Sequence, residues 1–380
     1  MRSKQNPLHE LEDLGQSVWL DYIRRQLLFS PEFRRMIDED GLKGMTSNPT
    51  IFEKAIDGSD DYASQLGKLV NAGRGIDEIY EALTTDDIKT AADALRPIYD
   101  RANGRDGFVS YEVSPLLAND TDGTIKAARR YWQMIGRPNL MIKVPSTPAG
   151  IPAIEQLISE GLNINITLMF SLRHYDAVAE AYISGLERRV AAGNSIKRVA
   201  SVASVFVSRV ETLVDKYLDT RLKTQPDDRV ASLRGTAAVA GTKLIYQRFK
   251  EIFHRDRFKA LAARGAGIQR PLWASTGTKN LAYSDIKYVQ ELIGPDTVNT
   301  MPPATMDAYR DHGQPRATIE ENLEGARATV RQLAGAGIDL DVIGEELQKE
   351  GVELFAKSFD ALLAVIRRRN NEATAGAAAR

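Results

Sequence analysis

Cysteine is absent from this sequence. Its absence excludes a disulfide framework, a cysteine-ligated zinc or iron–sulfur site and a thiol nucleophile, so catalysis must come from other side chains. An excess of one charge is absent too, because 50 Lys and Arg residues are balanced by 51 Asp and Glu residues. Without a broad basic surface there is no support for a nucleic-acid partner, and any phosphate site must be local.

Long apolar runs are also missing. No window approaches the roughly 20 apolar residues of a membrane span, and residues 1–10 lack the apolar core of a secretory signal. We therefore expect no membrane partner and a cytoplasmic location. The four histidines are scattered and form no metal-ligand motif, so we expect no metal and no organic cofactor. They are His9, His174, His254 and His312.

Short β-like runs alternate with amphipathic helical segments along the chain, the pattern of βα units and a parallel sheet. Eight such runs are present, which predicts a single (β/α)8 TIM barrel. The expected strands are Ser17–Ile23, Gly44–Thr50, Gly107–Val113, Asn139–Pro145, Asn163–Phe170, Arg198–Val205, Pro271–Ser275 and Thr297–Met301.

Segments with helical spacing lie between and after these strands. They are Ile76–Ala102, Thr121–Ile135, Gly150–Gly161, Leu172–Ala192, Gly241–Phe253, Leu281–Ile293, Thr318–Ala334 and Val342–Arg369. We expect Phe206–Arg270 to hold two or three extra helices rather than a second sheet. An apolar stripe in the last segment, including Phe355, predicts a C-terminal helix packed on the barrel. Residues 1–369 would form one domain, and residues 370–380 a disordered tail.

An open, doubly wound sheet is the alternative, since it too alternates strands and helices. Two observations count against it. No G-x-G-x-x-G motif opens a helix after the first strand, and polar groups recur at the carboxyl ends of most of the strands. A (β/α)8 barrel collects its active site at those ends.

Lys143 ends the fourth strand among Leu140, Ile142 and Val144. Burial penalises the ammonium form, and a neutral amine is the nucleophile that attacks a carbonyl. The alternative is a lysine that extends from the strand end into solvent. Glu112 ends the third strand, where it is a plausible acid and base. An ion pair with a barrel lysine is its alternative role.

Other polar side chains lie at the carboxyl ends of the first, second and fifth strands. Asp21 ends the first, although an isolated aspartate there would more often cap a helix. Asn48, Asn165 and Thr167 can hold a polyol and a water without adding charge. Asn48 precedes a proline and also signals a turn. Asn165 is more informative, because a buried amide must find hydrogen-bond partners.

A local phosphate site is predicted after the sixth and seventh strands. Ser204 lies at the end of the sixth strand and Arg209 at the start of the segment after it, where a guanidinium can bind an anion with two hydrogen bonds. Ser275 and Lys279 lie in a loop of hydroxyls, a glycine and a cation, the kind that binds phosphate in barrels. The alternative for Arg209 is a surface salt bridge with Glu211 or Asp215.

Together these segments resemble the ordered signatures of the transaldolase family, from about Leu14 to beyond Ser275. The signatures are Thr46-Ser-Asn-Pro, Tyr111-Glu-Val, Leu140-Met-Ile-Lys-Val-Pro-Ser-Thr, Asn163-Ile-Asn-Ile-Thr-Leu-Met-Phe-Ser and Ala274-Ser. The chain length resembles the larger bacterial form. One departure is present: other members place an arginine two positions after the phosphate-binding serine, whereas this chain has Gly277 and then Lys279, which can serve as a point charge.

The resemblance implies a transferase of the pentose phosphate pathway in carbohydrate metabolism, with sugar phosphates as substrates. It implies Lys143 as the Schiff-base lysine and Asp21 and Glu112 as the acid/base carboxyls. By the same resemblance Asn48, Asn165, Thr167 and Ser204 order substrate and a catalytic water, and Arg209 and Ser275 bind phosphate. Two rivals remain open: a class I fructose-6-phosphate aldolase, and a non-catalytic barrel that binds sugar phosphates. We expect a monomer or homodimer.

Overall fold

Eight parallel strands close into a barrel, with β1 hydrogen-bonded to both β2 and β8. The structure, a computed structural model, describes residues 6–378, with side chains described through residue 372. The strands are β1 Gln16–Asp21, β2 Leu42–Thr46, β3 Phe108–Glu112, β4 Leu140–Pro145, β5 Ile164–Met169, β6 Ser201–Phe206, β7 Arg270–Ala274 and β8 Thr297–Met301. The expected (β/α)8 barrel is confirmed, and the open-sheet alternative is wrong because the sheet closes on itself.

All eight strands lie where the sequence predicts them, with shifts of a few residues at their ends. The largest shift is in β2, which ends at Thr46 rather than at Thr50. Asn48 explains the early end, because its side-chain oxygen accepts a hydrogen bond from the Ile51 amide at 3.0 Å and so caps a helix. The asparagine–proline pair thus starts a helix directly after the strand.

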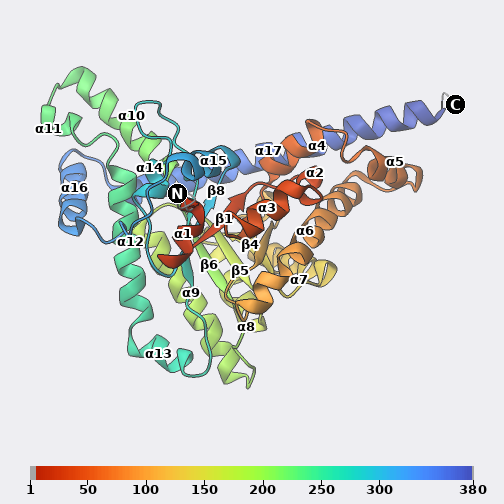
Figure 1. The fold of residues 1–380 in the computed structure, drawn as a ribbon, viewed down its shortest axis with the longest axis horizontal. Coiled ribbons are helices and arrows are strands. Elements are labelled where there is room, and N and C mark those ends of the chain that lie inside the picture. Colours follow the sequence, from red (N-terminus) through yellow and green to blue (C-terminus); the bar gives the residue numbers. More distant parts are fainter. Residues whose placement is uncertain (1–5, 379–380) are drawn as a thin grey trace, which may run out of the picture.

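Helices surround the barrel on all sides (Figure 1). Those before β6 are α1 Pro7–Asp13, α2 Arg25–Leu28, α3 Pro31–Asp38, α4 Pro49–Asp57, α5 Ala63–Asn71, α6 Ile76–Arg101, η1 Pro115–Leu117, α7 Thr121–Ile135, α8 Gly150–Glu160 and α9 Leu172–Ala191. After β6 come α10 Ser208–Thr224, α11 Asp228–Ala231, α12 Ala237–Phe253, α13 Asp256–Ala262, α14 Lys287–Gln290, α15 Pro303–His312, α16 Leu323–Gly335 and α17 Leu340–Ala378. None of these described helices has the length and apolar character to cross a membrane.

The segment between β6 and β7 is helical, as expected, but it holds two long and two short helices, α10 to α13. One predicted helix, Leu281–Ile293, is wrong, since only α14 forms there. Polar side chains explain the difference. Asn280 accepts a hydrogen bond from the amide of Ala282 at 2.9 Å, and Thr278 donates to the carbonyl of Ser284 at 2.8 Å. These bonds stabilise turns in place of helical hydrogen bonds.

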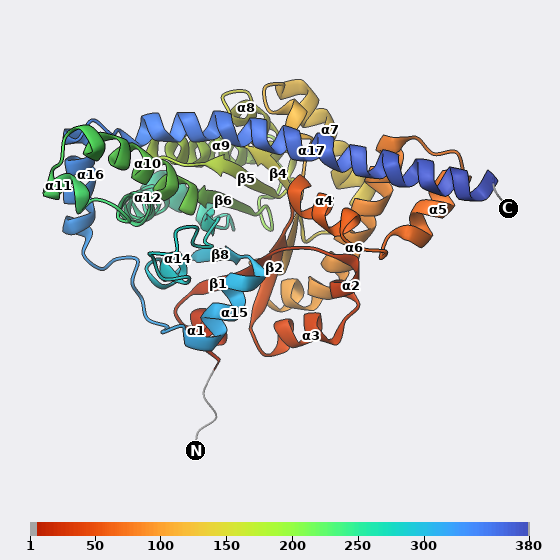
Figure 2. The same cartoon turned by 90° about the horizontal axis from the view of Figure 1, so that it is seen from above.

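The C-terminal helix α17 packs on the barrel, as predicted. Figure 2 shows it crossing the molecule from the side of α10 and α16 to the side of α4 and α5. On its way it contacts β5, so it lies over the carboxyl ends of strands. The backbone continues as helix to Ala378, which differs from the expected disordered tail from residue 370. Alanine favours helix, and this stretch is rich in alanine. Residues 379–380 lie outside the described residues.

Candidate functional site

Lys143 lies inside the barrel and is only 4% exposed. The register of β3 and β4 pairs it with Glu112, and its Nζ lies 3.2 Å from Glu112 Oε2. Nζ also donates a hydrogen bond to the Ser47 carbonyl at 3.2 Å. The alternative of a solvent-exposed lysine is therefore wrong. The predicted ion pair of Glu112 is present, and it is formed with Lys143 itself.

Asp21 ends β1 at the same level of the barrel, since the register pairs it with Thr46 of β2. The Thr46 hydroxyl donates a hydrogen bond to Asp21 Oδ1 at 2.7 Å and lies 2.7 Å from the Thr300 hydroxyl. Asp21 does not cap the following helix, because the cap position of α2 is Arg24. Its side chain faces the barrel mouth instead.

Burial raises the pKa of both carboxyl groups, Asp21 and Glu112. The positive charge of Lys143 is the next influence on each and lowers the pKa, and for Asp21 the hydrogen bond from Thr46 lowers it further. The pKa of each carboxyl remains above its ordinary value. A carboxyl with a raised pKa can exchange protons nearer to neutral pH, as general acid–base catalysis requires.

Asn165 bridges three strands inside the barrel. Its amide nitrogen donates to the Ser110 hydroxyl at 2.9 Å, and its carbonyl oxygen accepts from the Ser204 hydroxyl at 2.7 Å. The register of β4 and β5 places Asn165 beside Lys143. The buried amide has therefore found partners, and it fixes the neighbouring hydroxyls next to the lysine.

Thr167 and Asn48 differ in how their polar atoms are satisfied. The Thr167 hydroxyl is buried and has no hydrogen-bond partner among the described residues, although its side chain lines a cavity. Asn48 uses its oxygen to cap α4 and also lines this cavity. Thr167 thus offers a free hydroxyl that a water or a substrate hydroxyl can satisfy.

Arg209 is half-buried in the first turn of α10, between two aromatic rings. Its guanidinium carbon lies 5.4 Å from the centre of the Phe206 ring and 5.8 Å from that of Phe355. Burial lowers the pKa of Arg209, and nearby carboxylates oppose this shift. The rings hold the cation by cation–π contact and leave its hydrogen-bond donors for an anion.

Glu211 and Asp215 do not pair with Arg209, so the surface salt bridge considered above is wrong. Glu211 accepts a hydrogen bond from the Ala237 amide, and Asp215 accepts one from the Gly235 amide, both at 3.0 Å. These carboxylates bind the start of α12. Arg209 consequently has no ion-pair partner closer than 4.0 Å in the described part of the chain.

The loop after β7 joins the first turn of α10. The hydroxyls of Ser275 and Ser208 lie 2.9 Å apart, and the Ser208 amide donates to the Ser275 carbonyl at 3.1 Å. Ser275 has a φ of 55°, a left-handed conformation that is uncommon for serine and is often found at functional sites. Lys279 is exposed and reaches the same cavity.

One cavity of about 290 Å³ gathers most of the predicted site residues. Eight of the ten line it: Asp21, Asn48, Lys143, Thr167, Ser204, Arg209, Ser275 and Lys279. Glu112 and Asn165 lie behind its wall, in contact with Lys143 and Ser204. The remaining lining residues were not predicted: Thr46, Thr50, Ile51, Lys54, Phe206, Ala274, Gly277, Thr300, Pro302 and Phe355.

Thr46 is the last residue of β2 and Thr300 the last but one of β8, so the rule that selected Asp21 could have found them too. Phe355 gave no such signal. Its spacing in the sequence indicated only a buried helix face, and α17 brings it to the cavity from more than 200 residues beyond Lys143.

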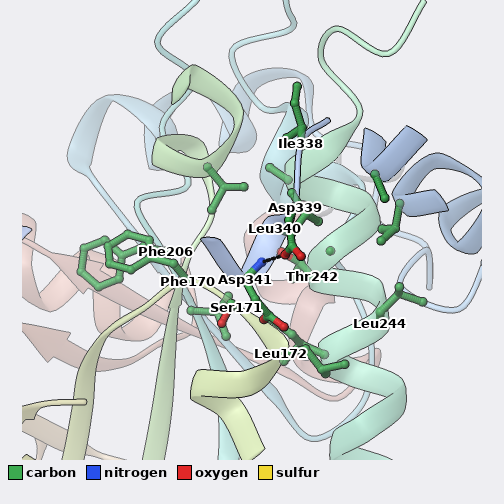
Figure 3. Close-up of a pocket in the computed structure, with 17 residues that line it drawn as sticks. Phe170, Ser171, Leu172, Phe206, Thr242, Leu244, Ile338, Asp339, Leu340 and Asp341 are labelled. Carbon is green, nitrogen blue, oxygen red and sulfur yellow. Dashed lines mark hydrogen bonds between the residues drawn. The ribbon is translucent and has the colours of Figure 1, made fainter. Parts of the chain in front are cut away.

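A second cavity, of about 210 Å³, is also lined by Phe206 (Figure 3). Its walls are mostly apolar and include Phe170, Leu172, Leu244 and Ile338. Asp339 and Asp341 lie at its edge, where the side chain of Asp339 accepts a hydrogen bond from the Asp341 amide at 2.7 Å. It offers no amine beside a carboxyl. The polar cavity around Lys143 is therefore the candidate active site.

The polar cavity and its wall combine the buried amine of Lys143, two carboxyls with raised pKa, several hydroxyls and the cation Arg209. This set suits the attack of an amine on the carbonyl of a phosphorylated substrate. In residues 6–372 no cluster of three or more potential metal-ligating side chains is present. The fold and site thus define a (β/α)8 barrel with a lysine and acid/base site at the carboxyl ends of its strands.

Comparison with known proteins places this barrel in a family. Residues 18–366 match the family described as Transaldolase/Fructose-6-phosphate aldolase. The chain is 46% identical over 364 residues to a transaldolase of Trichodesmium erythraeum, covering 94% of this chain and 96% of that protein. It is 47% identical over 361 residues to one of Thiobacillus denitrificans, covering 95% and 99%. The chain belongs to the transaldolase/fructose-6-phosphate aldolase family. The expected family and an enzyme of the transaldolase type are confirmed.

Proposed function

We propose that this enzyme moves a dihydroxyacetone unit from a ketose phosphate to an aldose phosphate through a Schiff base on Lys143. The donor would be sedoheptulose 7-phosphate or fructose 6-phosphate, and the acceptor glyceraldehyde 3-phosphate or erythrose 4-phosphate. The observation that carries the proposal is the buried Lys143 amine, 3.2 Å from the Glu112 carboxylate, in a cavity that Arg209 also lines.

The first step needs a neutral amine. Glu112 can take the proton from Lys143, because the two groups are in contact and burial raises the Glu112 pKa. The amine then adds to the ketone carbon, and Glu112 assists the loss of water to give an iminium ion. The iminium accepts electrons from the neighbouring C3–C4 bond and so prepares its cleavage.

Asp21 acts in the second step. It removes the proton of the C4 hydroxyl while the C3–C4 bond breaks, which releases an aldose phosphate and leaves a dihydroxyacetone enamine on Lys143. Addition of the enamine to a second aldose phosphate reverses these steps. Asn48, Asn165, Thr167 and Ser204 would order the substrate hydroxyls and the water.

Arg209, Ser275 and Lys279, which also line the cavity, would bind the phosphate. Arg209 and Ser275 can supply directed hydrogen bonds, whereas the exposed Lys279 acts as a point charge. We further propose that the enzyme works in the cytoplasm, in the pentose phosphate pathway, as a monomer or homodimer. Light scattering on the purified protein tests the oligomeric state.

Borohydride trapping tests the assignment of Lys143. Reduction of the protein in the presence of fructose 6-phosphate should attach a three-carbon or six-carbon unit to Lys143, which peptide mapping identifies. Lys54 and Lys279 line the same cavity and serve as internal controls. Label on either of them, or on a Lys143→Ala variant, would refute the mechanism.

A class I aldolase that releases free dihydroxyacetone uses the same lysine chemistry and is the rival activity. The two are separated by assaying fructose 6-phosphate with and without erythrose 4-phosphate. A transaldolase forms sedoheptulose 7-phosphate much faster than it releases dihydroxyacetone. Comparable rates of the two would favour the aldolase.

A further inference from the structure

One face of α17 lies directly on the barrel mouth. Gly344, Gln348, Gly351 and Phe355 follow one another at spacings of four, three and four residues, so they share a side of the helix. A Cβ atom at Gly344 would lie 2.7 Å from the Cβ of Ser171, and one at Gly351 would lie 2.8 Å from a Leu168 methyl. The two glycines therefore allow an approach that larger residues would prevent.

Gln348 anchors this face. Its side-chain nitrogen lies 3.0 Å from the Ser146 hydroxyl and 3.1 Å from the carbonyl oxygens of Ser146 and Leu168. These acceptors belong to the ends of β4 and β5, and Gln348 is only 5% exposed. Moving α17 away would break the hydrogen bonds of this buried amide to both strands, which costs free energy. The helix α17 is therefore a fixed cover over the site.

Phe355 projects from this cover into the polar cavity. Its ring centre lies 5.8 Å from Lys143 Nζ and 5.8 Å from the guanidinium carbon of Arg209, and the side chain is 4% exposed. Near both cations the ring presents a surface without hydrogen-bond donors or acceptors. A water next to this ring would lose partners that it has in bulk solvent.

We propose that Phe355 is a specificity-determining residue that keeps water from the nucleophilic carbon of the enamine on Lys143, so that the three-carbon unit is transferred rather than protonated and released. The proposal rests on the Schiff-base function above and adds to it the reason why transfer prevails. It assigns the role to α17, which contributes no acid or base to the mechanism.

The competing release reaction begins when a water molecule reaches the nucleophilic carbon of the enamine. The water passes a proton from a carboxyl to this carbon, which regenerates the iminium. Water then adds to the iminium carbon and loses a proton, the carbon–nitrogen bond breaks, and dihydroxyacetone leaves with the Lys143 amine restored. Transfer consumes the enamine by attack on an aldehyde and needs no water at that step. Both products leave by hydrolysis of an iminium on Lys143, so the two reactions differ only in what happens to the enamine. Excluding water from its nucleophilic carbon therefore slows release and leaves transfer unaffected.

The test is the partition ratio, the amount of dihydroxyacetone released per molecule of sedoheptulose 7-phosphate formed from fructose 6-phosphate and erythrose 4-phosphate. Phe355→Ala should raise this ratio several-fold, and Phe355→Leu should raise it less because leucine keeps an apolar wall. Both products come from the same folded molecules, so the ratio does not depend on how much of a variant is active.

Phe359→Ala is the matched control. Phe359 lies one turn further along the same helix, is also buried, and packs on the ring of Tyr80 at 5.3 Å without lining the cavity. The partition ratio of the Phe359→Ala variant should equal that of the unaltered protein. An equal rise in this variant would mean that any loosening of α17 admits water, and it would overturn the role of Phe355.

An unchanged ratio in both Phe355 variants, with borohydride still trapping substrate on Lys143, would also overturn the inference. Failure of the unaltered protein to trap substrate would instead refute the Schiff-base function. If Phe355→Ala fails to fold, Phe355→Leu decides alone, because it preserves most of the buried volume.

Discussion

Arg209 and Lys279 reach the same cavity from very different surroundings. Arg209 is half-buried between two rings, whereas Lys279 is exposed in the loop after β7. A charged hydrogen bond in a partly buried site is worth about 1.5–3 kcal/mol, while an exposed ion pair contributes about 0–1 kcal/mol. The two cations should therefore differ in their contribution to phosphate binding.

Arg209→Ala should raise KM for fructose 6-phosphate about 10- to 100-fold, and Lys279→Ala should raise it less than about fivefold, by the free energies above. Steady-state kinetics on both variants measures the difference. Unphosphorylated fructose is the control substrate, because its KM should change little in either variant. Equal effects of the two substitutions would show that the site does not distinguish them.

Glu211 lies near the site but outside the proposed mechanism. Burial, and then the negative charge of Asp215, raise the pKa of Glu211 to about 7. The folded protein therefore holds this proton at pH values where the unfolded chain has already lost it. Stability should fall as pH rises from the ordinary glutamate value to about 7, because the charged form is disfavoured only in the folded state.

Glu211→Gln removes this titration. The variant should be more stable than the unaltered protein at pH 8, by roughly 1–3 kcal/mol, and equally stable near pH 4, where Glu211 is protonated. Urea unfolding at several pH values measures the difference. Exposed Glu353→Gln is the control and should show no such pH dependence. A stability difference that does not change with pH would contradict the explanation.

At the scale of elements, α17 depends on small residues for its close contact with the barrel. Gly344 is buried against Ser171, which caps α9. Gly335, the last residue of α16, is exposed and has no atom within 4 Å of an added Cβ. Alanine favours helix over glycine at both positions, so the two substitutions differ mainly in the space available.

Gly344→Ala should destabilise the protein by about 1–3 kcal/mol, because overpacking outweighs the gain in helix propensity. Gly335→Ala should be neutral or stabilise by up to about 1 kcal/mol. Thermal unfolding of both variants measures the effects. If Gly344→Ala proved as stable as Gly335→Ala, α17 would not be held as tightly on the barrel mouth as the distances indicate.

The loop after β7 shows where helix prediction from sequence fails. Residues 281–293 have helical spacing, yet asparagine, serine and threonine side chains bond to the backbone around them and keep most of the segment in turns. The same loop carries Ser275 and Lys279. Local polar contacts, which periodicity does not reveal, thus leave this segment free to line the cavity.

At the scale of the whole molecule, α17 completes the apolar core. Phe355, Phe359, Leu362 and Ile366 are all less than 9% exposed, whereas residues 371–372 are exposed. Burying one large apolar side chain contributes about 1.5–3 kcal/mol, so four of them approach the 5–15 kcal/mol that stabilises a typical protein. The exposed residues 371–372 make no comparable contribution.

Deleting residues 371–380 should change Tm by less than about 2 °C and leave transfer activity intact. Deleting residues 355–380 should prevent formation of the native fold, because it exposes the apolar surface that α17 covers. Thermal unfolding and circular dichroism distinguish the two. A stable, active protein after the longer deletion would mean that the barrel does not need its last helix.

The sequence determined the number and order of the strands, because each apolar run ends in a polar residue or a turn. By the same rule it placed Lys143, Glu112 and Asp21 together, since parallel strands in a barrel present their carboxyl ends at one mouth. It also predicted the amide of Asn165 and the cation Arg209. Their position along a strand or at its end was enough to identify these residues from the sequence.

Only the tertiary structure decided what the last helix covers. A stripe of apolar residues shows that a helix face is buried, but not which surface buries it. The position of Phe355 beside Lys143 depends on two glycines and Gln348, which set the height of α17 above the strands. The raised pKa of both carboxyls likewise comes from enclosure by distant segments, because desolvation depends on everything that surrounds a group.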